Sequence, residues 1–464
     1  MSATRDERLD VAAIAVLDVG KTNVRLAAVD ARGHAIEART RANAVLPAPP
    51  YPHFDSNALF EWILDGLATF ATKHPIKTIV PVTHGAAAAL IAGTELVLPI
   101  LDYEYDGPER VDDYDVDARR FSETVSPGLP LGLNLGRQLA WLELEHPRAF
   151  ARAEHLLPYP GYWAWRLSGA LSFEATSLGC HTDLWSPSEG APSTLARMRK
   201  WDRLLPDRAD PWKRVGSISD EVVRTTGLDP DCSVLAGIHD SNASYLVHRV
   251  HRTEPFCVVS TGTWVVALAH GGTLEGLREE RDTLANVDAF GEPIPTARFM
   301  GGREYAAIAG REGLDAEPTE QDLEAVLHSG VLAMPSFSET GGPFPKRPGA
   351  IIGPKPASAA QRAALAALYC ALMTDVCLDL LDARGEIVVE GRFAKNRLYC
   401  RALAALRNAQ PLFRSLDETG TFAGAALLAR YPEAGEAPRI ERIAPFSQHE
   451  ICAHRARWRA ELER

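Results

Sequence analysis

The chain has 464 residues, of which 46% are hydrophobic and 24% charged, the balance of a globular protein. Its length predicts two domains of roughly 200 residues each. The formal net charge of −12 argues against nucleic acid or an anionic membrane as a partner. Phosphate ligands are not excluded, because backbone N–H groups can hold them whatever the net charge.

Cysteine usage and the N-terminal segment indicate the cell compartment. The seven cysteines are scattered, and none forms a Cys-x-x-Cys pair, as in a reduced protein with thiols in its core. The first eight residues are polar and lack the apolar core of a signal peptide. No uninterrupted apolar run reaches the ~18 to 20 residues of a membrane span, and no His/Cys cluster has zinc spacing. We therefore expect a cytoplasmic protein without a structural metal.

The first predicted element is a β-hairpin whose tip carries polar side chains. Residues 12–17 have the pattern of a buried strand that ends at Asp18, and residues 24–29 form the returning strand. A carboxylate at this point can hold Mg²⁺, directly or through water, although it can equally cap the turn. A glycine lets the backbone approach a phosphate, and the neighbouring residues add donors. The tip residues are Gly20, Lys21, Thr22 and Asn23.

A helix, a strand and two polar turns are predicted next. The helix covers residues 56–70, with Asp55 or Ser56 as N-cap, and residues 78–82 form a short buried strand. The following turn carries His84 and Gly85 and is predicted to lead into an Ala-rich helix. Ligands bind at such strand ends in α/β folds. A histidine at the edge of the core explains the pattern equally well.

The polar aromatic segment that follows contains Asp102 and Tyr103 and could line a sugar pocket, or be a solvated loop. Farther along, a buried strand over 234–238 leads to His239 and Asp240, where a helix begins. A carboxylate near a helix N-terminus stays ionised and can accept a proton from a hydroxyl. Taken alone, Asp240 is equally a helix N-cap, and His239 either orients a ligand or packs in the core.

The opening pattern then recurs. Residues 256–260 and 264–269 read as two strands joined by Thr261, Gly262 and Thr263, whose donors suit the β- and γ-phosphates of a nucleotide. Two hairpins with similar tips suggest a duplicated fold, although any hairpin can carry a glycine turn.

The last third of the chain is predicted to contain a third ligand turn. A long helix over 359–381 and a strand over 386–389 precede the turn 391–396, a candidate platform for adenosine. An ordinary strand-to-helix loop is the alternative. A small-residue helix follows at 422–429, and the polar residues after 433 are expected to be peripheral.

The order of these motifs resembles the FGGY carbohydrate kinase family of the actin/hexokinase superfamily, over about residues 11–430. The Leu167–Gly169 and Glu174–Ser177 stretches are also similar to family motifs. The most specific pieces are Asp18-Val19-Gly20, Thr226-Gly227-Leu228 leading into Ala236–Asp240, Ser260–Trp264, Glu390-Gly391 with Ala394–Asn396, and Gly424–Ala426.

The resemblance implies an α/β fold of two ribonuclease-H-like domains flanking a deep cleft. Residues 11–245 would be the sugar-binding domain, 246–435 the ATP-binding domain and 436–464 a peripheral segment. Asp240 would be the catalytic base and Asp18 the metal residue. The implied substrate residues are His84, Gly85, Asp102, Tyr103, His239, Asp240 and Trp264. The implied ATP residues are Gly20, Lys21, Thr22, Asn23, Thr261, Gly262, Thr263, Gly391, Arg392, Phe393 and Asn396.

The implied activity is ATP- and Mg²⁺-dependent phosphorylation of a hydroxyl of a small sugar. A ketose such as L-fuculose, L-rhamnulose or a pentulose is expected, and the chain could form a homodimer. A non-catalytic sugar or nucleotide sensor and an ATPase of the same superfamily are the alternatives. The sequence departs from the family where Lys21 replaces a hydroxyl residue, and where Arg392 and Phe393 replace glycines and could stack on the base or narrow its pocket.

Overall fold

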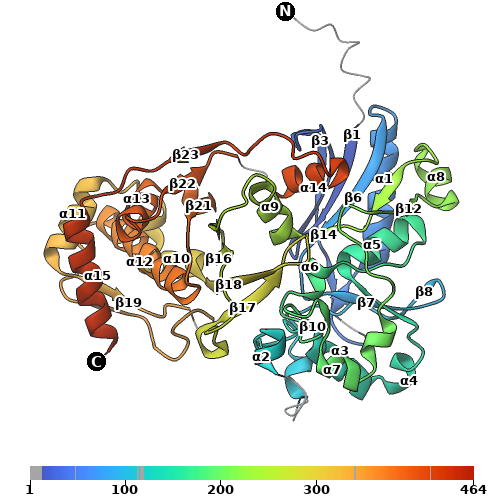
Figure 1. Ribbon diagram of the computed structural model, residues 1–464, viewed down its shortest axis with the longest axis horizontal. Helices are drawn as coiled ribbons and strands as arrows, with labels where there is room; N and C mark the ends of the chain where they lie inside the picture. Colours follow the sequence, from blue (N-terminus) through green and yellow to red (C-terminus); the bar gives the residue numbers. More distant parts are fainter. Residues whose placement is uncertain are drawn as a thin grey trace, which may run out of the picture. The chain divides into compact units, whose positions relative to one another are not determined.

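The computed structural model describes residues 13–47, 49–111, 114, 120–338, 341–417 and 420–463. The chain forms two compact units (Figure 1). Unit 1 comprises the residues up to 251 together with 285–293 and 419–437, and unit 2 comprises 252–284, 294–418 and 438–464. The polar N-terminal octapeptide lies outside the described residues.

The main sheet of unit 1 combines a meander with parallel strands. Strands β1 to β3 pair antiparallel, β6 pairs parallel with β1, and both β13 and β14 pair parallel with β6. The order is β12-β13-β6-β1-β2-β3. The bounds are β1 (Ala13–Val19), β2 (Asn23–Val29), β3 (Ala35–Ala42), β6 (Ile76–Thr83), β12 (Arg214–Ser217), β13 (Ser233–Leu235) and β14 (Ile238–His239).

Helices cover both faces of this sheet. Ala15 and Leu17 of β1 pack with α1 (Ser56–Ala71), α5 (Tyr159–Ser168) and α8 (Asp220–Thr226) in one core cluster. Ile14 and Val16 pack with α9 (Asp240–Arg249) and α14 (Gly420–Arg430) in another, and Figure 1 shows α14, in red, beside the blue strand β1. Since successive strand residues face opposite sides, Asp18 lies on the side of α9.

The structure corrects the Ala-rich helix predicted after Gly85. Ala88–Ala92 is strand β7, which pairs with β8 (Glu95–Leu98) and β9 (His155–Pro158) in a small sheet. Gly93 has a φ of +55° and turns the chain between β7 and β8. Pairing on both edges outweighs the helix propensity of alanine. Beside this sheet lie α3 (Leu135–Glu145) and α4 (Pro147–Phe150).

Unit 2 repeats the pairing scheme of unit 1. A meander of β15, β16 and β18 is followed by β21 parallel to β15, β22 parallel to β21 and β23 antiparallel to β22. This repeat supports the duplication predicted from the two hairpins. The strands are β15 (Phe256–Thr261), β16 (Val265–His270), β17 (Thr283–Val287), β18 (Pro293–Phe299), β21 (Glu386–Gly391), β22 (Leu412–Ser415) and β23 (Ile440–Arg442).

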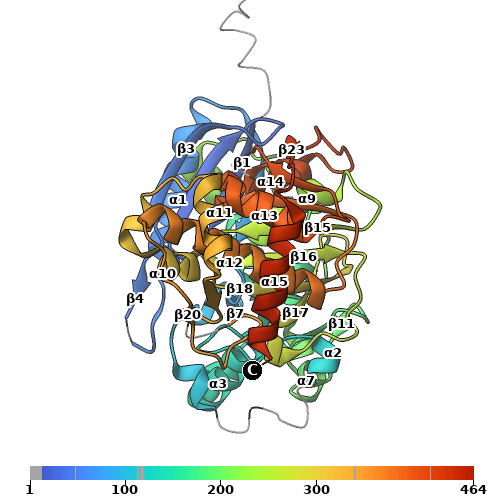
Figure 2. The ribbon, with the colours of Figure 1, turned by 90° about the vertical axis from the view of Figure 1, so that its left-hand side faces the viewer.

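A long apolar helix forms the centre of unit 2. Helix α12 (Ala359–Leu380) is long and apolar enough to cross a membrane, but 89% of its apolar window is buried inside the protein. Helices α10 (Gly301–Leu314), α11 (Glu320–Ser329) and α13 (Arg397–Leu406) pack on it (Figure 2). Burial of this kind identifies α12 as a core helix.

Two features of the C-terminal third differ from the prediction. Helix α14, predicted in the second domain, belongs to unit 1 because Gly424 lets it approach α9; a Cβ there would lie 2.0 Å from the Ala243 carbonyl oxygen. Helix α15 (Gln448–Leu462), predicted to be peripheral, buries Trp458 completely.

The remaining elements are short. They are β4 (Val45–Leu46), β5 (His53–Phe54), α2 (Phe121–Thr124), α6 (Ala175–Leu178), β10 (Trp185–Ser186), β11 (Ala191–Pro192), α7 (Thr194–Met198), β19 (Leu332–Met334) and β20 (Ala350–Ile352). Four 3₁₀ turns lie at Gly107–Arg110, Trp201–Leu204, Glu279–Arg281 and Arg392–Lys395.

Candidate functional site

Strand register brings the predicted catalytic and sugar residues of unit 1 to one edge of its sheet. Val19 of β1 and His239 of β14 both pair with Thr83 of β6, and all three strands run parallel. Their carboxyl ends therefore meet, as at ligand sites of α/β folds. Asp18, His84 and Asp240 are the immediate neighbours of these three paired residues.

Asp18 is a partly buried carboxylate with an unusual pKa. Burial and the negative charge of Asp240 raise the pKa of Asp18 to about 7, against the opposing effect of the Arg25 guanidinium. A buried carboxyl beside a second carboxylate suits a hard cation, which prefers oxygen ligands. No group of three or more His, Cys, Asp or Glu side chains is arranged to hold a metal within the described ranges. The residues present thus fit a Mg²⁺ that takes most of its ligands from phosphates and water.

His84 presents an unused acceptor to this edge. Its Nδ1 lies 2.7 Å from the carbonyl oxygen of Gly85, so Nδ1 carries the proton and Nε2 keeps its lone pair. Nε2 is buried and has no hydrogen-bond partner among the described residues. Burial lowers the pKa of His84 to about 4, so the ring is neutral at pH 7. A neutral, oriented imidazole of this kind can accept a hydrogen bond from a ligand hydroxyl.

Lys21 reaches the predicted sugar loop. Its ammonium lies 2.6 Å from an oxygen of Asp102 and 3.3 Å from an oxygen of Glu104. It also lies 5.2 and 5.3 Å from the ring centroids of Phe54 and Tyr103. These contacts place Lys21 with the predicted sugar residues, although the sequence assigns it to phosphate.

The other residues of the first hairpin tip keep a polar, open turn. The Gly20 N–H donates to the Asn23 carbonyl at 3.0 Å and closes the turn. The side chains of Thr22 and Asn23 are exposed. Both remain accessible to a ligand from solvent.

Asp240 is the first residue of α9, and the N-cap position belongs to His239. The alternative that Asp240 serves only as an N-cap is therefore wrong. Its Oδ1 accepts a hydrogen bond from the Ser241 N–H at 2.6 Å and lies 3.4 Å from Nε2 of His239. The carboxylate is 35% exposed, so it is anchored locally and still accessible to a ligand.

Gly85 leaves room for the ring of His239. A Cβ at this position would lie 3.0 Å from Nε2 of His239, so a larger residue would displace that ring.

In unit 2, Thr261 ties the second hairpin to the predicted adenosine turn. Its hydroxyl donates to the Glu390 carbonyl at 2.5 Å and accepts from the Phe393 N–H at 2.8 Å. Gly391 has a φ of +78°, and a Cβ there would lie 2.1 Å from the Thr261 carbonyl oxygen. This close approach requires glycine at position 391. The next two positions carry the large residues Arg392 and Phe393.

The predicted nucleotide residues of unit 2 differ in accessibility. Phe393 is 4% exposed, with its ring centroid 5.7 Å from that of Tyr305 and 5.0 Å from that of Tyr399. Its ring therefore lies in the core, whereas Arg392 is exposed. Asn396 caps α13, accepting from the Tyr399 N–H at 3.0 Å.

The second hairpin tip itself is open to solvent at Thr263 and half-closed at Gly262 and Trp264. The Arg298 guanidinium lies 4.8 Å from the Trp264 ring centroid. Trp264 therefore packs through its ring face against Arg298 of the same unit. Its predicted role in sugar binding stays a prediction.

Some residues at the unit 1 edge were missed by sequence reasoning. Phe54 and Tyr159 stack beside His84, with ring centroids 5.3 and 5.1 Å away. The Thr176 hydroxyl accepts a hydrogen bond from the His239 N–H at 3.0 Å. The Glu174–Ser177 stretch is similar to a family motif, but its residue types alone predict no contact with the sheet edge.

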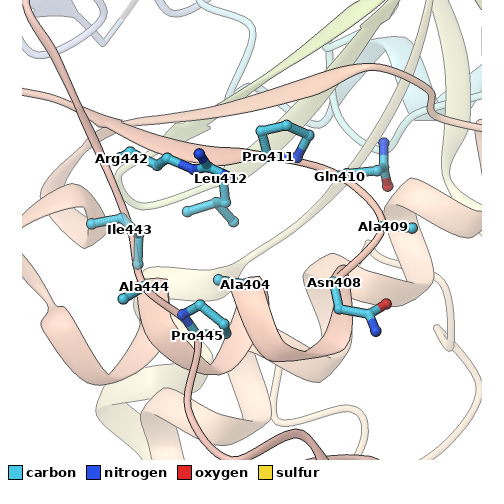
Figure 3. A pocket seen from close by; sticks show the side chains of 10 residues that line it. All are labelled: Ala404, Asn408, Ala409, Gln410, Pro411, Leu412, Arg442, Ile443, Ala444 and Pro445. Carbon is cyan, nitrogen blue, oxygen red and sulfur yellow. The ribbon is translucent and has the colours of Figure 1, made fainter.

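Unit 2 also contains a groove of about 550 Å³ (Figure 3). It is lined by the end of α13, the start of β22 and the loop after β23. Leu412 pairs with Ile387, four residues before Gly391 on β21, so the groove lies at the amino end of the parallel strands. Ligands of α/β sheets bind at the other end. The groove contains none of the predicted site residues.

Comparison with known proteins places the chain in a family. Residues 253–438 match the model of the carbohydrate kinase FGGY C-terminal domain. L-fuculokinase of Salmonella typhi is 26% identical over 284 residues, which are 56% of this chain and 57% of that protein. The match thus spans little more than half the length of this relative.

Solved structures agree over nearly the full length. A carbohydrate kinase from Novosphingobium aromaticivorans is 37% identical, with a TM-score of 0.89, 98% of this chain and 99% of that chain being covered. A xylulose kinase from Lactobacillus acidophilus, 17% identical with a TM-score of 0.81 over 98% and 97% of the two chains, shares the fold. With these two actin/hexokinase-type α/β units, the chain belongs to the FGGY carbohydrate kinase family.

Proposed function

We propose that the chain transfers the γ-phosphoryl group of ATP to a hydroxyl of a small uncharged sugar. A ketose such as L-fuculose, L-rhamnulose or a pentulose is the substrate class that we favour. The observation that carries the proposal is the meeting of Asp240 with the unused acceptor of His84 at the carboxyl ends of β14 and β6. One group suits removal of a proton, and the other suits orientation of a polyol.

Charge at this edge supports an uncharged substrate. The carboxylates of Asp102, Glu104 and Asp240 outnumber the ammonium of Lys21, which contacts two of them. A sugar acid would bring a further negative charge toward these groups and be repelled. A hydroxyl can instead donate to a carboxylate and accept from an ammonium.

In the proposed reaction, the attacking sugar hydroxyl forms the new O–P bond while the bond between the γ-phosphorus and the β–γ bridging oxygen of ATP breaks. Asp240 accepts the hydroxyl proton, and ADP leaves with the bridging oxygen. Its 35% exposed carboxylate is free to meet a hydroxyl. His84 accepts from a second hydroxyl and fixes the sugar, and closely packed rings around it limit water.

We assign the nucleotide to unit 2. The exposed side-chain donors of Thr263 and Arg392 suit phosphates, and Gly262 closes the hairpin tip between them through its N–H bond to the Trp264 carbonyl. The turn from Gly391 to Asn396 suits adenosine. Asp18 would hold Mg²⁺ in unit 1. When bound with the nucleotide, Mg²⁺ would neutralise phosphate charge.

The test is ADP release across L-fuculose, L-rhamnulose, ribulose, xylulose, glycerol and gluconate. Asp240→Asn should lower kcat by about 10² to 10⁴ while sugar binding by calorimetry persists. Ser241→Ala, which removes a hydroxyl that donates to Asp240 at 3.3 Å but keeps the carboxylate and the Ser241 N–H bond, is the comparison and should retain most of the turnover. Undiminished turnover in Asp240→Asn would refute the role of Asp240. Binding of sugar and ATP with no ADP release would favour a sensor, and ADP release that no sugar accelerates would favour an ATPase.

A further inference from the structure

We propose that Glu174 and Thr176 are positioning residues that fix the turn bearing Asp240. The proposal rests on the proposed role of Asp240 as proton acceptor. It concerns a buried chain of hydrogen bonds that runs from a carboxylate, through a hydroxyl, to the backbone next to Asp240.

The chain begins at Glu174, whose side chain is fully buried. Its Oε1 accepts from the Ser177 N–H at 2.9 Å. Its Oε2 accepts from the Thr176 N–H at 2.6 Å and from the Thr176 hydroxyl at 2.5 Å. Burial raises the pKa of Glu174, and the hydrogen bonds from Ser177 and Thr176 oppose that effect. The bond to Oε2 gives the Thr176 hydroxyl a fixed direction.

The chain continues to the strand that carries the base. Because the Thr176 hydroxyl donates to Glu174, its lone pairs are left to accept, and the His239 N–H donates to it at 3.0 Å. His239 precedes Asp240 and ends β14, a strand of two residues. Without this bond, a buried N–H would lack its partner at the junction of β14 and α9.

Helix capping alone does not explain the arrangement. Glu174 is the N-cap of α6, and the two N–H groups that it accepts satisfy that helix. The additional bond of Thr176 leaves α6 and reaches a segment 63 residues later in the chain. The side chain of Asp240 interacts with its two chain neighbours, through hydrogen bonds from Ser241 and the contact with Nε2 of His239. The position of Asp240 therefore depends on how these neighbours are held.

The neighbouring Ser177 provides a matched control. Its hydroxyl is buried on the same short helix and lowers the pKa of the Glu174 carboxyl. Ser177→Ala therefore removes a buried hydroxyl beside Glu174 while the bond from the Thr176 hydroxyl to the His239 N–H stays in place.

The experiment compares Thr176→Val, Thr176→Ser and Ser177→Ala by steady-state kinetics, with folding checked by circular dichroism. We expect Thr176→Val to lower kcat about 10- to 100-fold, because displacing the Asp240 carboxylate by about 1 Å can cost about 10² in rate. The KM values for sugar and ATP should stay nearly unchanged. Thr176→Ser keeps the hydroxyl and should have nearly the kcat of the unaltered protein. Ser177→Ala should also have a kcat close to that of the unaltered protein.

Equal kcat in Thr176→Val and the unaltered protein would overturn the proposal. Equal losses in Thr176→Val and Ser177→Ala would also overturn it, as they would indicate general destabilisation. If Thr176→Val does not fold, Glu174→Gln and Thr176→Ser decide: the proposal requires a lower kcat in the first and near-full kcat in the second. Failure of the proposed function is separate, since Asp240→Asn would then retain full turnover.

Discussion

The ammonium of Lys21 lies 2.6 Å from the carboxylate of Asp102, and the two side chains are 17% and 9% exposed. The pair joins the tip of the first hairpin to the predicted sugar loop. Lys21 thus stands where the phosphate loop of the family has a hydroxyl residue, yet its contacts are with Asp102, Glu104 and two aromatic rings.

Replacing Lys21 separates the two roles that it could have. We expect Lys21→Met to raise KM for the sugar about 10- to 100-fold and to leave KM for ATP within about twofold, because the substitution leaves Asp102 unpaired at the sugar pocket. Steady-state titration of each substrate at saturating levels of the other measures both. Glu104→Gln, which alters the exposed partner, is the control and should have a small effect. A selective rise in KM for ATP would return Lys21 to the phosphate side.

His84 can be tested without emptying its aromatic surroundings. His84→Phe keeps a ring against Phe54 and Tyr159 but removes the Nε2 acceptor. Loss of a hydrogen bond to an uncharged partner costs about 1 kcal/mol, so KM for the sugar should rise about 5- to 10-fold with KM for ATP unchanged. Isothermal titration with the best sugar of the panel gives the same comparison directly. Unchanged sugar affinity would show that Nε2 does not face the ligand.

Much of this edge was predictable because local patterns dominate there. A short apolar run over residues 12–17 predicted β1, and Asp18 ends that run. Asp55 proved to be the N-cap of α1, one of the two residues that the sequence offered. A ligand site was expected at the strand end that carries His84, and the register of Val19, Thr83 and His239 brings two further strand ends to that point.

What could not be predicted depends on partners distant in sequence. Ala88–Ala92 looks helical until β8 and β9 pair with it on both edges. Lys21 looks like a phosphate donor until the loop at Asp102, about 80 residues later, comes within reach. Phe393 looks available for stacking until Tyr305 and Tyr399 enclose it. The strand at Ala88–Ala92 corrects the predicted helix, and the roles of Lys21 and Phe393 depend on tertiary contacts that local preference does not show.

Asp18 predicts a pH dependence of stability in the protein without metal. Because its pKa in the folded protein is about 7 and its ordinary value is 3.8, the folded state holds a proton that the unfolded state releases between these values. The free energy of unfolding should therefore fall as pH rises from about 4 to about 7, by at most about 4 kcal/mol.

Urea denaturation at pH 5 and pH 7.5 measures the fall in the free energy of unfolding. In Asp18→Asn this fall should be smaller, because the side chain no longer titrates. Asp65→Asn, at an exposed carboxylate paired with Arg39, is the control and should keep the full pH dependence. An identical loss in Asp18→Asn and the unaltered protein would contradict the prediction.

The last prediction concerns the C-terminal helix. Trp458 is fully buried, and its Nε1–H donates to the Ala333 carbonyl oxygen at 2.8 Å, so α15 is anchored to β19. Trp458→Ala should lower the free energy of unfolding by about 3 to 5 kcal/mol, because it removes a large buried ring and leaves that carbonyl unpaired. Trp458→Phe should cost less, since it keeps most of the apolar contact, and Ala456→Ser on the exposed face should cost almost nothing. Denaturant unfolding followed by circular dichroism measures all three. A loss below about 1 kcal/mol in Trp458→Ala would mean that α15 is a peripheral appendage, as its polar composition suggests, and that unit 2 is stable without it.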